Sequence, residues 1–317
     1  MRMVELDPDE LRRRLADAHV TNLTPLAGGA SSLTFRGEQS GRPVVVKVAP
    51  PGVEPVGHRD VLRQGRIIKA LAATDVPVPA VLWEDAGSPP LLVMSHVEGD
   101  CEEPLFDGGT PTGDLLERYR NACRVLAALH CLSPAQLGLS GEPVVGPATE
   151  VRRWGETLRT VDAALVPGWQ KVRDALLRRA PKAMAPSVVH GDFRLGNLLA
   201  VGARIEAVID WEIWSIGDPR IDVGWFLINC DPDTYQRVPA SAGIAPPTDE
   251  LAEIYQSELG CEITDLGWFR ALACFKSAAT WSLIVKHNRR RRCPRDELEA
   301  MAPSLPRLLG RAASMLD

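Results

Sequence analysis

The spacing of hydrophobic positions changes about one third of the way along the chain. Up to residue 97, short apolar runs bounded by glycine or proline predict strands. These runs are LTPLAGG, SSLTFRGE, PVVVKVA and LLVMSHV. Beyond residue 98, apolar positions recur at helical spacing, as in residues 112–132. We therefore predict an N-lobe over residues 1–97 and a mainly helical C-lobe over residues 98–317, joined by a hinge at Ser95 to Asp100.

Two helices are predicted in the N-lobe and several in the C-lobe. Asp7 and Pro8 are typical of a helix start, and residues 59–72 have helical spacing despite Gly65 in their middle. In the C-lobe, residues 150–179 predict helix broken near Pro167. Further helices are predicted at 222, 248–259, 264–288 and 295–316.

Composition narrows the class of protein. Of the 317 residues, 45% are hydrophobic and 24% charged, as in a soluble globular protein. A net charge of -5 gives no basic footprint for nucleic acid, and no apolar run is long enough to span a membrane. The seven cysteines include no C-x-x-C pair, which favours reduced thiols in the cytoplasm over a disulfide framework or a zinc site.

Candidate catalytic residues gather between Val188 and Asp222. Two β-branched runs in this stretch are each followed by a carboxylate, Asp192 and Asp210. Asn197 stands five positions after Asp192, the spacing that a kinase catalytic loop uses for its base and a metal ligand. Two strand ends carrying acids permit metal-assisted hydrolysis as readily as phosphoryl transfer.

Two further features would suit a bound phosphate. Lys47 ends the apolar run VVVK, where its cation can reach phosphate oxygens or simply extend to solvent. The small-residue loop containing Gly29, Ser31 and Ser32 offers backbone N–H groups and hydroxyls, although most such loops are turns. No G-x-x-x-x-G-K-[ST] motif is present, which disfavours a P-loop enzyme.

Together these motifs resemble a known family. HGDFRLGNLL followed by VIDWEIWSIGDPRIDVGW is similar to the aminoglycoside phosphotransferase family, and the resemblance extends over nearly the whole chain. DVPVPAVLW and VMSHVEG resemble one branch, the phosphotransferase-like domains at the N-terminus of some acyl-CoA dehydrogenases. The resemblance implies an α+β, two-lobed protein-kinase-like fold, with a small β-rich N-lobe and a larger, mainly helical C-lobe.

The resemblance also implies roles for four residues. Lys47 would contact the α and β phosphates of ATP, and Asp192 would be the catalytic base. Asn197 and Asp210 would hold Mg²⁺, since hard oxygen ligands suit this ion.

Roles for the hinge and for the support of the catalytic loop follow in the same way. The main chain of Ser95 and Val97 would receive the adenine, with Met94 behind it. Asp222 would hold the backbone of the catalytic loop, and His190 would brace that loop.

One departure from the family pattern lies at Gln64, where the family usually has a glutamate paired with the strand lysine. The amide can accept a hydrogen bond from Lys47 but offers no charge pairing. Asp60, one helical turn earlier, could substitute if the helix were shifted. We expect activity to survive the change, because Lys47 mainly orients phosphates.

The predicted function is ATP-dependent, Mg²⁺-assisted phosphoryl transfer to the hydroxyl of a small molecule. HNRRRR at 287–292 would suit a phosphate-bearing acceptor such as a hydroxyacyl-CoA, or would complement a helix C-terminus. The helices after residues 112 and 248 should line the acceptor pocket.

Other functions remain open. Acidic residues of the last third could instead bind an aminoglycoside antibiotic, or form a solvated face. These are Asp231, Asp233, Asp249, Glu250, Glu253, Glu258, Glu262 and Asp265. A nucleotide-binding, kinase-like protein without catalysis is a third possibility, supported by Gln64 alone. A protein kinase is disfavoured, because only seven residues separate Asp210 from Asp218.

Overall fold

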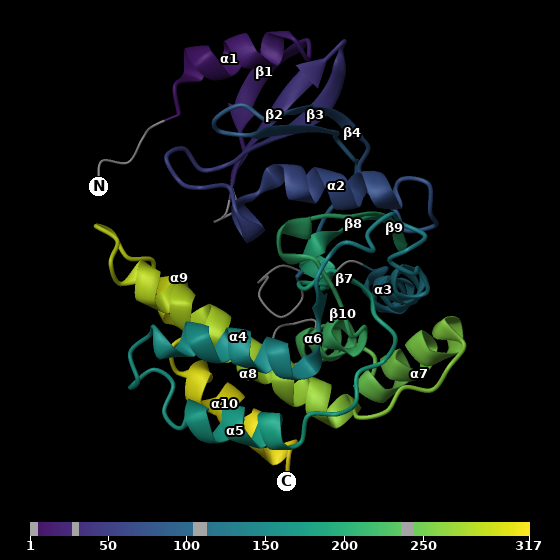
Figure 1. Cartoon of the computed structure of the whole chain (residues 1–317), viewed down its shortest axis with the longest axis vertical. Helices are drawn as coiled ribbons and strands as arrows, with labels where there is room; N and C mark the ends of the chain where they lie inside the picture. The colour runs from purple at the N-terminus through teal and green to yellow at the C-terminus, as the bar shows by residue number, and fades with distance from the viewer. Residues whose placement is uncertain (1–5, 27–31, 104–112, 236–243) are drawn as a thin grey trace. The chain divides into compact units, whose positions relative to one another are not determined.

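The computed structural model describes residues 6–26, 32–103, 113–235 and 244–317. The chain divides into two compact units (Figure 1). The N-terminal unit comprises Met1–Asp100 with Asn197–Trp214, and the helical unit comprises Cys101–Gly196 with Ser215–Asp317. Residues 197–214, which we assigned to the C-lobe, thus group with the N-terminal unit.

A five-stranded antiparallel sheet forms the centre of the N-terminal unit, in the order β1-β2-β3-β5-β4. Its strands are β1 (Val20–Pro25), β2 (Leu33–Gln39), β3 (Arg42–Val48), β4 (Val81–Asp85) and β5 (Leu91–Ser95). In β3, Val44, Val46 and Val48 are buried in one core cluster with Leu11 and Leu15 of α1 (Pro8–Ala16). Because side chains alternate along a strand, Lys47 faces the opposite side of the sheet.

Two helices accompany this sheet (Figure 1). The Asp7 side chain caps α1 as predicted, by accepting a hydrogen bond from the N–H of Asp9. The second helix, α2 (Val61–Leu71), follows the short 3₁₀ helix η1 (Gly57–Arg59) and packs on β4 and β5. Gly65 lies in that contact: a Cβ there would stand 2.1 Å from Glu84 Oε1 and 3.0 Å from Leu92 Cδ1, so a larger residue would require these side chains to move.

A hairpin joins residues 197–214 to the N-terminal unit. The strands β8 (Leu198–Val201) and β9 (Arg204–Val208) pair with each other, after the 3₁₀ turn η2 (Leu195–Asn197) and before η3 (Trp211–Ile213). Asp100 forms a β-bridge with Ala200, and the N–H of Val208 donates to the Pro77 carbonyl at 2.8 Å. Backbone contacts therefore fix Asn197 and Asp210 to the unit that carries Lys47.

Helices make up most of the helical unit. They are α3 (Leu115–His130), α4 (Pro147–Arg159), α5 (Trp169–Arg178), α6 (Arg220–Cys230), α7 (Thr248–Leu259), α8 (Leu266–Asn288), α9 (Asp296–Glu299) and α10 (Ser304–Ser314). A small sheet of β6 (Val144–Val145), β10 (Ser215–Gly217) and β7 (Ser187–Val189) accompanies them. The main core cluster joins α4, α5, α6, α8 and α10.

Two predictions about helix continuity have different outcomes. The predicted break near Pro167 is confirmed, because α4 and α5 are separate and Gly168 has a φ of +75°. The single helix over 295–316 is wrong, since α9 ends at Glu299 and α10 begins at Ser304. Pro303 precedes α10, and a proline disfavours helical geometry in the residue before it.

The two apolar runs that flank the polar loop are strands, but they belong to different sheets. The first is β7, which pairs with β10, and the second is β9, which pairs with β8.

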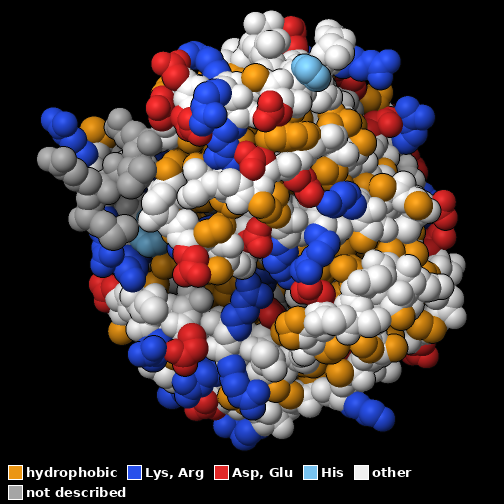
Figure 2. Space-filling model, turned by 45° about the horizontal axis from the view of Figure 1, so that its top comes forward, with side chains coloured by type: hydrophobic (Ala, Val, Ile, Leu, Met, Phe, Trp, Pro, Cys, Tyr) orange, Lys and Arg blue, Asp and Glu red, His pale blue; other side chains and the backbone are white. Residues whose placement is uncertain are grey.

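The surface and the hydropathy of the helices can be described for the same residues. Acidic and basic side chains are interspersed over the face drawn in Figure 2. Within the described part of the chain, none of the helices combines the length and apolar character that crossing a membrane requires.

Candidate functional site

The N-terminal unit contains a cavity of about 330 Å³, which we call the Lys47 cavity. The predicted site residues that line it are Ser32, Lys47, Gln64, Met94, Ser95, Val97, Asn197 and Asp210. The predicted loop residues Gly29 and Ser31 lie outside the described residues. Eight side chains or main-chain segments that are scattered over 179 positions of sequence thus border one space.

Lys47 lies at the centre of a polar triad. Its Nζ donates to Gln64 Oε1 at 2.9 Å and forms an ion pair with Asp210 Oδ1 at 3.1 Å. Gln64 is 2% exposed, and its Nε2 is buried with no hydrogen-bond partner among the described residues. The alternative partner considered for Lys47, Asp60, instead caps α2 by accepting from the N–H groups of Leu62 and Arg63.

Asp210 and Asn197 fit a magnesium ion by their donor chemistry. Asp210 sits at the end of β9 in the left-handed region, with a φ of +65°, an uncommon conformation for a residue with a side chain. Asn197 is buried, and its carbonyl accepts from the N–H of Ile209 at 3.0 Å, which links the two residues through the backbone. One carboxylate and one amide oxygen bordering the same cavity suit Mg²⁺, which usually completes its shell with phosphate and water oxygens.

The hinge segment borders the other side of the cavity. Met94 is buried, and Ser95 and Val97 line the space beside it. The N–H of Ser95 donates to the Ala80 carbonyl at 2.8 Å. Any main-chain contact between Ser95 and a base would therefore use its carbonyl oxygen rather than its N–H.

In the helical unit, Asp222 fixes the loop that carries Asp192. The N–H groups of His190 and Gly191 donate to its two carboxylate oxygens at 2.6 and 2.8 Å. Burial alone would raise the pKa of this carboxyl, but His130, His190 and the Gly191 N–H outweigh it, so the pKa lies below its ordinary value. The structural role expected of Asp222 is confirmed.

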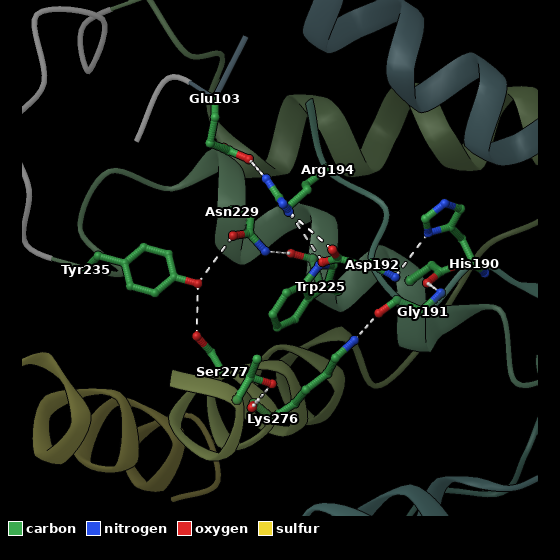
Figure 3. A network of polar contacts seen from close by, with 12 residues as sticks. Glu103, His190, Gly191, Asp192, Arg194, Trp225, Asn229, Tyr235, Lys276 and Ser277 are labelled. Atoms are coloured by element: carbon green, nitrogen blue, oxygen red, sulfur yellow. Dashed lines mark hydrogen bonds and ion pairs between the residues drawn. The ribbon is translucent and has the colours of Figure 1, made fainter. Parts of the chain in front are cut away.

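His190 braces the same loop, as predicted. It is fully buried, and its Nδ1 accepts from the N–H of Asp192 at 3.1 Å (Figure 3). This bond places the ring proton of the neutral form on Nε2. The histidine therefore orients the main chain at Asp192.

Donors on two sides hold the Asp192 carboxylate (Figure 3). Trp225 Nε1 donates to Oδ1 at 2.9 Å, and Arg194 Nε approaches Oδ2 at 3.4 Å. Arg194 also forms an ion pair with Glu103. Burial would lower the pKa of Arg194, but the charges of Asp192 and Glu103 raise it above its ordinary value.

A second cavity, of about 500 Å³, opens beside this carboxylate, and we call it the Asp192 cavity. Its described lining comes from the loop that carries Asp192, from α6, α8 and α9, and from two further residues outside helices. The lining residues are Glu103, Asp192, Arg194, Trp225, Asn229, Tyr235, Thr280, Trp281, Ile284, Glu297 and Leu298. Of the helices expected to line an acceptor pocket, α8 and α9 border this cavity, whereas α3 and α7 contribute none of these residues.

Sequence reasoning missed four residues around Asp192. Arg194 could have been found, since it lies two positions after Asp192, and Trp225 lies one helical turn after Asp222. Glu103 and Lys276 are 89 and 84 positions away from Asp192, and no local pattern connects them with it.

Comparison with known proteins identifies the family. A model of the phosphotransferase enzyme family matches residues 22–270, and the chain therefore belongs to this family. Mouse acyl-CoA dehydrogenase family member 11 is 28% identical over 278 residues, which cover 82% of this chain. The same match covers 35% of that relative, so the chain spans about a third of its length. The predicted resemblance to the acyl-CoA dehydrogenase branch is confirmed.

Solved structures establish the fold. A candidate aminoglycoside phosphotransferase from Ralstonia eutropha has a TM-score of 0.79 at 22% identity, covering 98% of each chain. Aminoglycoside phosphotransferase APH(4)-Ia, in a ternary complex with ADP and hygromycin B, has a TM-score of 0.65 at 18% identity, covering 95% of this chain and 98% of that one. These likenesses confirm the predicted α+β, protein-kinase-like fold.

Proposed function

We propose that this protein transfers the γ-phosphoryl group of ATP to a hydroxyl of a small molecule. The observation that carries the proposal is the Lys47 cavity, where Lys47, Asn197 and Asp210 converge. A cation with an adjacent carboxylate and amide oxygen is the set that phosphoryl-transfer sites use for a nucleotide and its metal.

The nucleotide would occupy the Lys47 cavity. Lys47, held by Gln64 Oε1, would contact the α and β phosphates, and the loop with Gly29, Ser31 and Ser32 would cover them. The Ser95 carbonyl and the Val97 main chain would receive the adenine against Met94. Support comes from the APH(4)-Ia structure, which was solved with ADP.

Asn197 and Asp210 would hold Mg²⁺ in this scheme. When bound, the ion neutralises charge on the phosphate oxygens of the nucleotide. Before the nucleotide arrives, Lys47 keeps the Asp210 carboxylate in place through its ion pair.

Asp192 would act as the base. Its carboxylate accepts the proton of the acceptor hydroxyl while the oxygen forms a bond to the γ-phosphorus, and the bond between that phosphorus and the bridging oxygen of ADP breaks. Trp225 and Arg194 orient the carboxylate for this step.

The acceptor that best matches the Asp192 cavity has an apolar body. Trp225, Trp281, Ile284 and Leu298 give the cavity apolar walls. Its carboxylates are already paired with arginine: Asp192 and Glu103 with Arg194, and Glu297 with Arg295 at 2.6 Å. A polycationic aminoglycoside would have to compete with these arginines.

The arginine run lies at the end of the helix that lines this cavity. Arg289 pairs with Glu299, whereas residues 290–292 are exposed in the connection between α8 and α9. That run begins five residues after Ile284, or about 8 Å along a helix at 1.5 Å per residue. A hydroxyacyl-CoA would offer a hydroxyl for Asp192, an apolar chain for the walls of the Asp192 cavity and phosphates for the arginine run.

A screen of acceptors tests the proposal. Purified protein with ATP and Mg²⁺ should release ADP when given hydroxyacyl-CoAs, and Asp192→Ala should abolish the release. Aminoglycosides in the same screen test the antibiotic-kinase alternative. ATP binding without ADP release for any acceptor would favour the non-catalytic alternative.

The seven free thiols fit a cytoplasmic location, which we propose on that ground.

A further inference from the structure

A buried lysine lies beneath the catalytic loop. Lys276, in the middle of α8, is 4% exposed, and its Nζ donates to the Gly191 carbonyl (Figure 3). The ammonium stands 4.0 Å from the centroid of the Trp225 ring and 5.5 Å from that of Trp154. It forms no ion pair with a described carboxylate, so one carbonyl and two aromatic faces replace its water shell.

This environment is costly for a lysine whose only purpose is packing. Burying an ammonium without a carboxylate partner is unfavourable, and cation–π contacts offset only part of that cost. A leucine or methionine would fill the same space without a desolvation penalty. The groups that the ammonium contacts therefore indicate its role.

Both contacts of Lys276 lead to Asp192. Gly191 directly precedes Asp192 in the chain, so the accepted hydrogen bond fixes the main chain that carries the base. Trp225 donates its indole N–H to Asp192 Oδ1 at 2.9 Å, so the ring under the ammonium is the one that orients the carboxylate.

Charged groups on other elements surround this lysine. Burial lowers the pKa of Lys276, while the charges of Asp192, Glu150 and Asp222 raise it and that of Arg153 lowers it. Glu150 is itself held, because it accepts from Trp154 Nε1 at 2.8 Å and pairs with Arg153.

We propose that Lys276 is a positioning residue for the catalytic base. Its ammonium holds Asp192 from two directions, through the Gly191 carbonyl and through the Trp225 ring. The proposal rests on the proposed function in assigning Asp192 as the base, but the geometry of the loop can be tested without activity.

The test compares Lys276→Met with a matched control on the same helix. Lys286 also donates to a backbone carbonyl, that of Thr160 at 2.6 Å, but Thr160 lies outside the catalytic loop, so Lys286→Met is the control. We measure ATP turnover with Mg²⁺, the Kd of ATP, and amide exchange of a peptide covering residues 187–197.

For Lys276→Met we expect a turnover at least about tenfold lower, since small displacements of a catalytic group have large effects. The Kd of ATP should stay within about twofold, because Lys276 is not among the residues that line the Lys47 cavity. The peptide should exchange faster than in the wild type, and Lys286→Met should match the wild type in all three.

If Lys276→Met has the same ATP turnover and the same amide exchange as the wild type, the proposal is overturned. A parallel loss of turnover and ATP binding would also overturn it, because that pattern indicates a general structural role. If wild-type protein shows no turnover with any acceptor, the proposed function fails, while the exchange comparison still decides the role of Lys276. If Lys276→Met does not fold, Trp225→Phe removes the indole N–H and part of the ring while leaving an aromatic side chain at this position, and unchanged turnover in that variant contradicts the proposal.

Discussion

The Lys47 cavity and the surroundings of Asp192 hold their key carboxylates in different ways. Asp210 follows the β8–β9 hairpin and is paired at 3.1 Å with Lys47 of strand β3. The Asp210 side chain is 35% exposed. Asp192 is held by the neutral N–H of Trp225 and a longer contact with Arg194, with a buried lysine one layer behind. A metal ligand can exchange a charged partner for an ion, whereas a base must keep its lone pairs available for a proton. This difference fits the roles that we propose, with Asp210 as a metal ligand and Asp192 as the base.

The largest expected effect is on the rate of phosphoryl transfer when the proposed base, Asp192, is replaced. Asp192→Asn should lower the rate of phosphoryl transfer by about 10²–10⁴, the usual contribution of general-base catalysis. The Kd of ATP should be unchanged, since Asp192 does not line the Lys47 cavity. Kinetics of ADP release alongside calorimetric ATP binding would measure both, with the exposed Asp233→Asn as control. Equal loss of binding and turnover would break the distinction between the two carboxylates.

A substitution of Asp222 tests whether the stability of the loop that carries Asp192 depends on this one buried carboxylate. Asp222→Asn should lower the free energy of unfolding at pH 7 by about 3–5 kcal/mol, because it leaves a buried hydrogen-bond network incomplete. The folded-state pKa of Asp222 is depressed, so its stabilisation is present above the ordinary carboxyl value near 3.8 and is lost as pH falls through the folded value.

Urea unfolding at pH 7 and near pH 3 measures this difference. The gap between wild type and Asp222→Asn should narrow at the lower pH. A gap that stays constant or widens would show that protonation of Asp222 does not contribute to acid sensitivity.

Lys47 should affect binding more than chemistry. Lys47→Met removes a charged hydrogen-bond donor worth about 1.5–3 kcal/mol, so the Kd of ATP should rise about ten- to a hundredfold. Exchange of the loop containing Asp192 should be unaffected. Lys69→Met is a matched control, since Lys69 pairs with Glu84 at 2.6 Å on the surface of the same unit. Unchanged ATP affinity in Lys47→Met would remove the main support for a nucleotide in this cavity.

The smallest effect is expected at Gln64. Gln64→Glu offers Lys47 a second carboxylate beside Asp210, and we expect turnover to change by no more than about fivefold, or 1 kcal/mol. The hydrogen bond at 2.9 Å already orients Lys47 without that charge. A wild-type protein that binds ATP and Mg²⁺ but consumes ATP only after Gln64→Glu would contradict this expectation.

The sequence predicted the Lys47 side of the molecule better than the Asp192 side, for a physical reason. Alternation in β3 shows which face Lys47 occupies, and the short motif from Asp192 to Asp210 reveals the candidate ligands. Lys276 stands in the apolar stretch ALACFKSAAT, where a lysine would be expected to point to solvent. Its burial depends on how α8 packs against α6 and the catalytic loop, and tertiary contacts of this kind leave no periodic signal.

The break between α9 and α10 and the residues that line the Asp192 cavity were hard to predict for a related reason, because both depend on tertiary contacts. Spacing alone could not reveal that residues 300–303 separate α9 from α10, so α9 was expected as part of one helix over residues 295–316. Likewise, acidic residues of the last third looked available, yet Asp231 pairs with Arg270 and Arg311, and Glu250 pairs with Arg120.

In the proposed transfer, a hydroxyl receives the γ-phosphoryl group of ATP and Asp192 takes the proton of that hydroxyl. The most direct measurement follows ATP labelled at the γ-phosphorus with Mg²⁺ and the best acceptor from the screen, and locates the label by mass spectrometry. The proposed transfer predicts label on the acceptor hydroxyl with wild-type protein and nearly none with Asp192→Asn. Label found only in free phosphate, or equal transfer by Asp192→Asn, would contradict it.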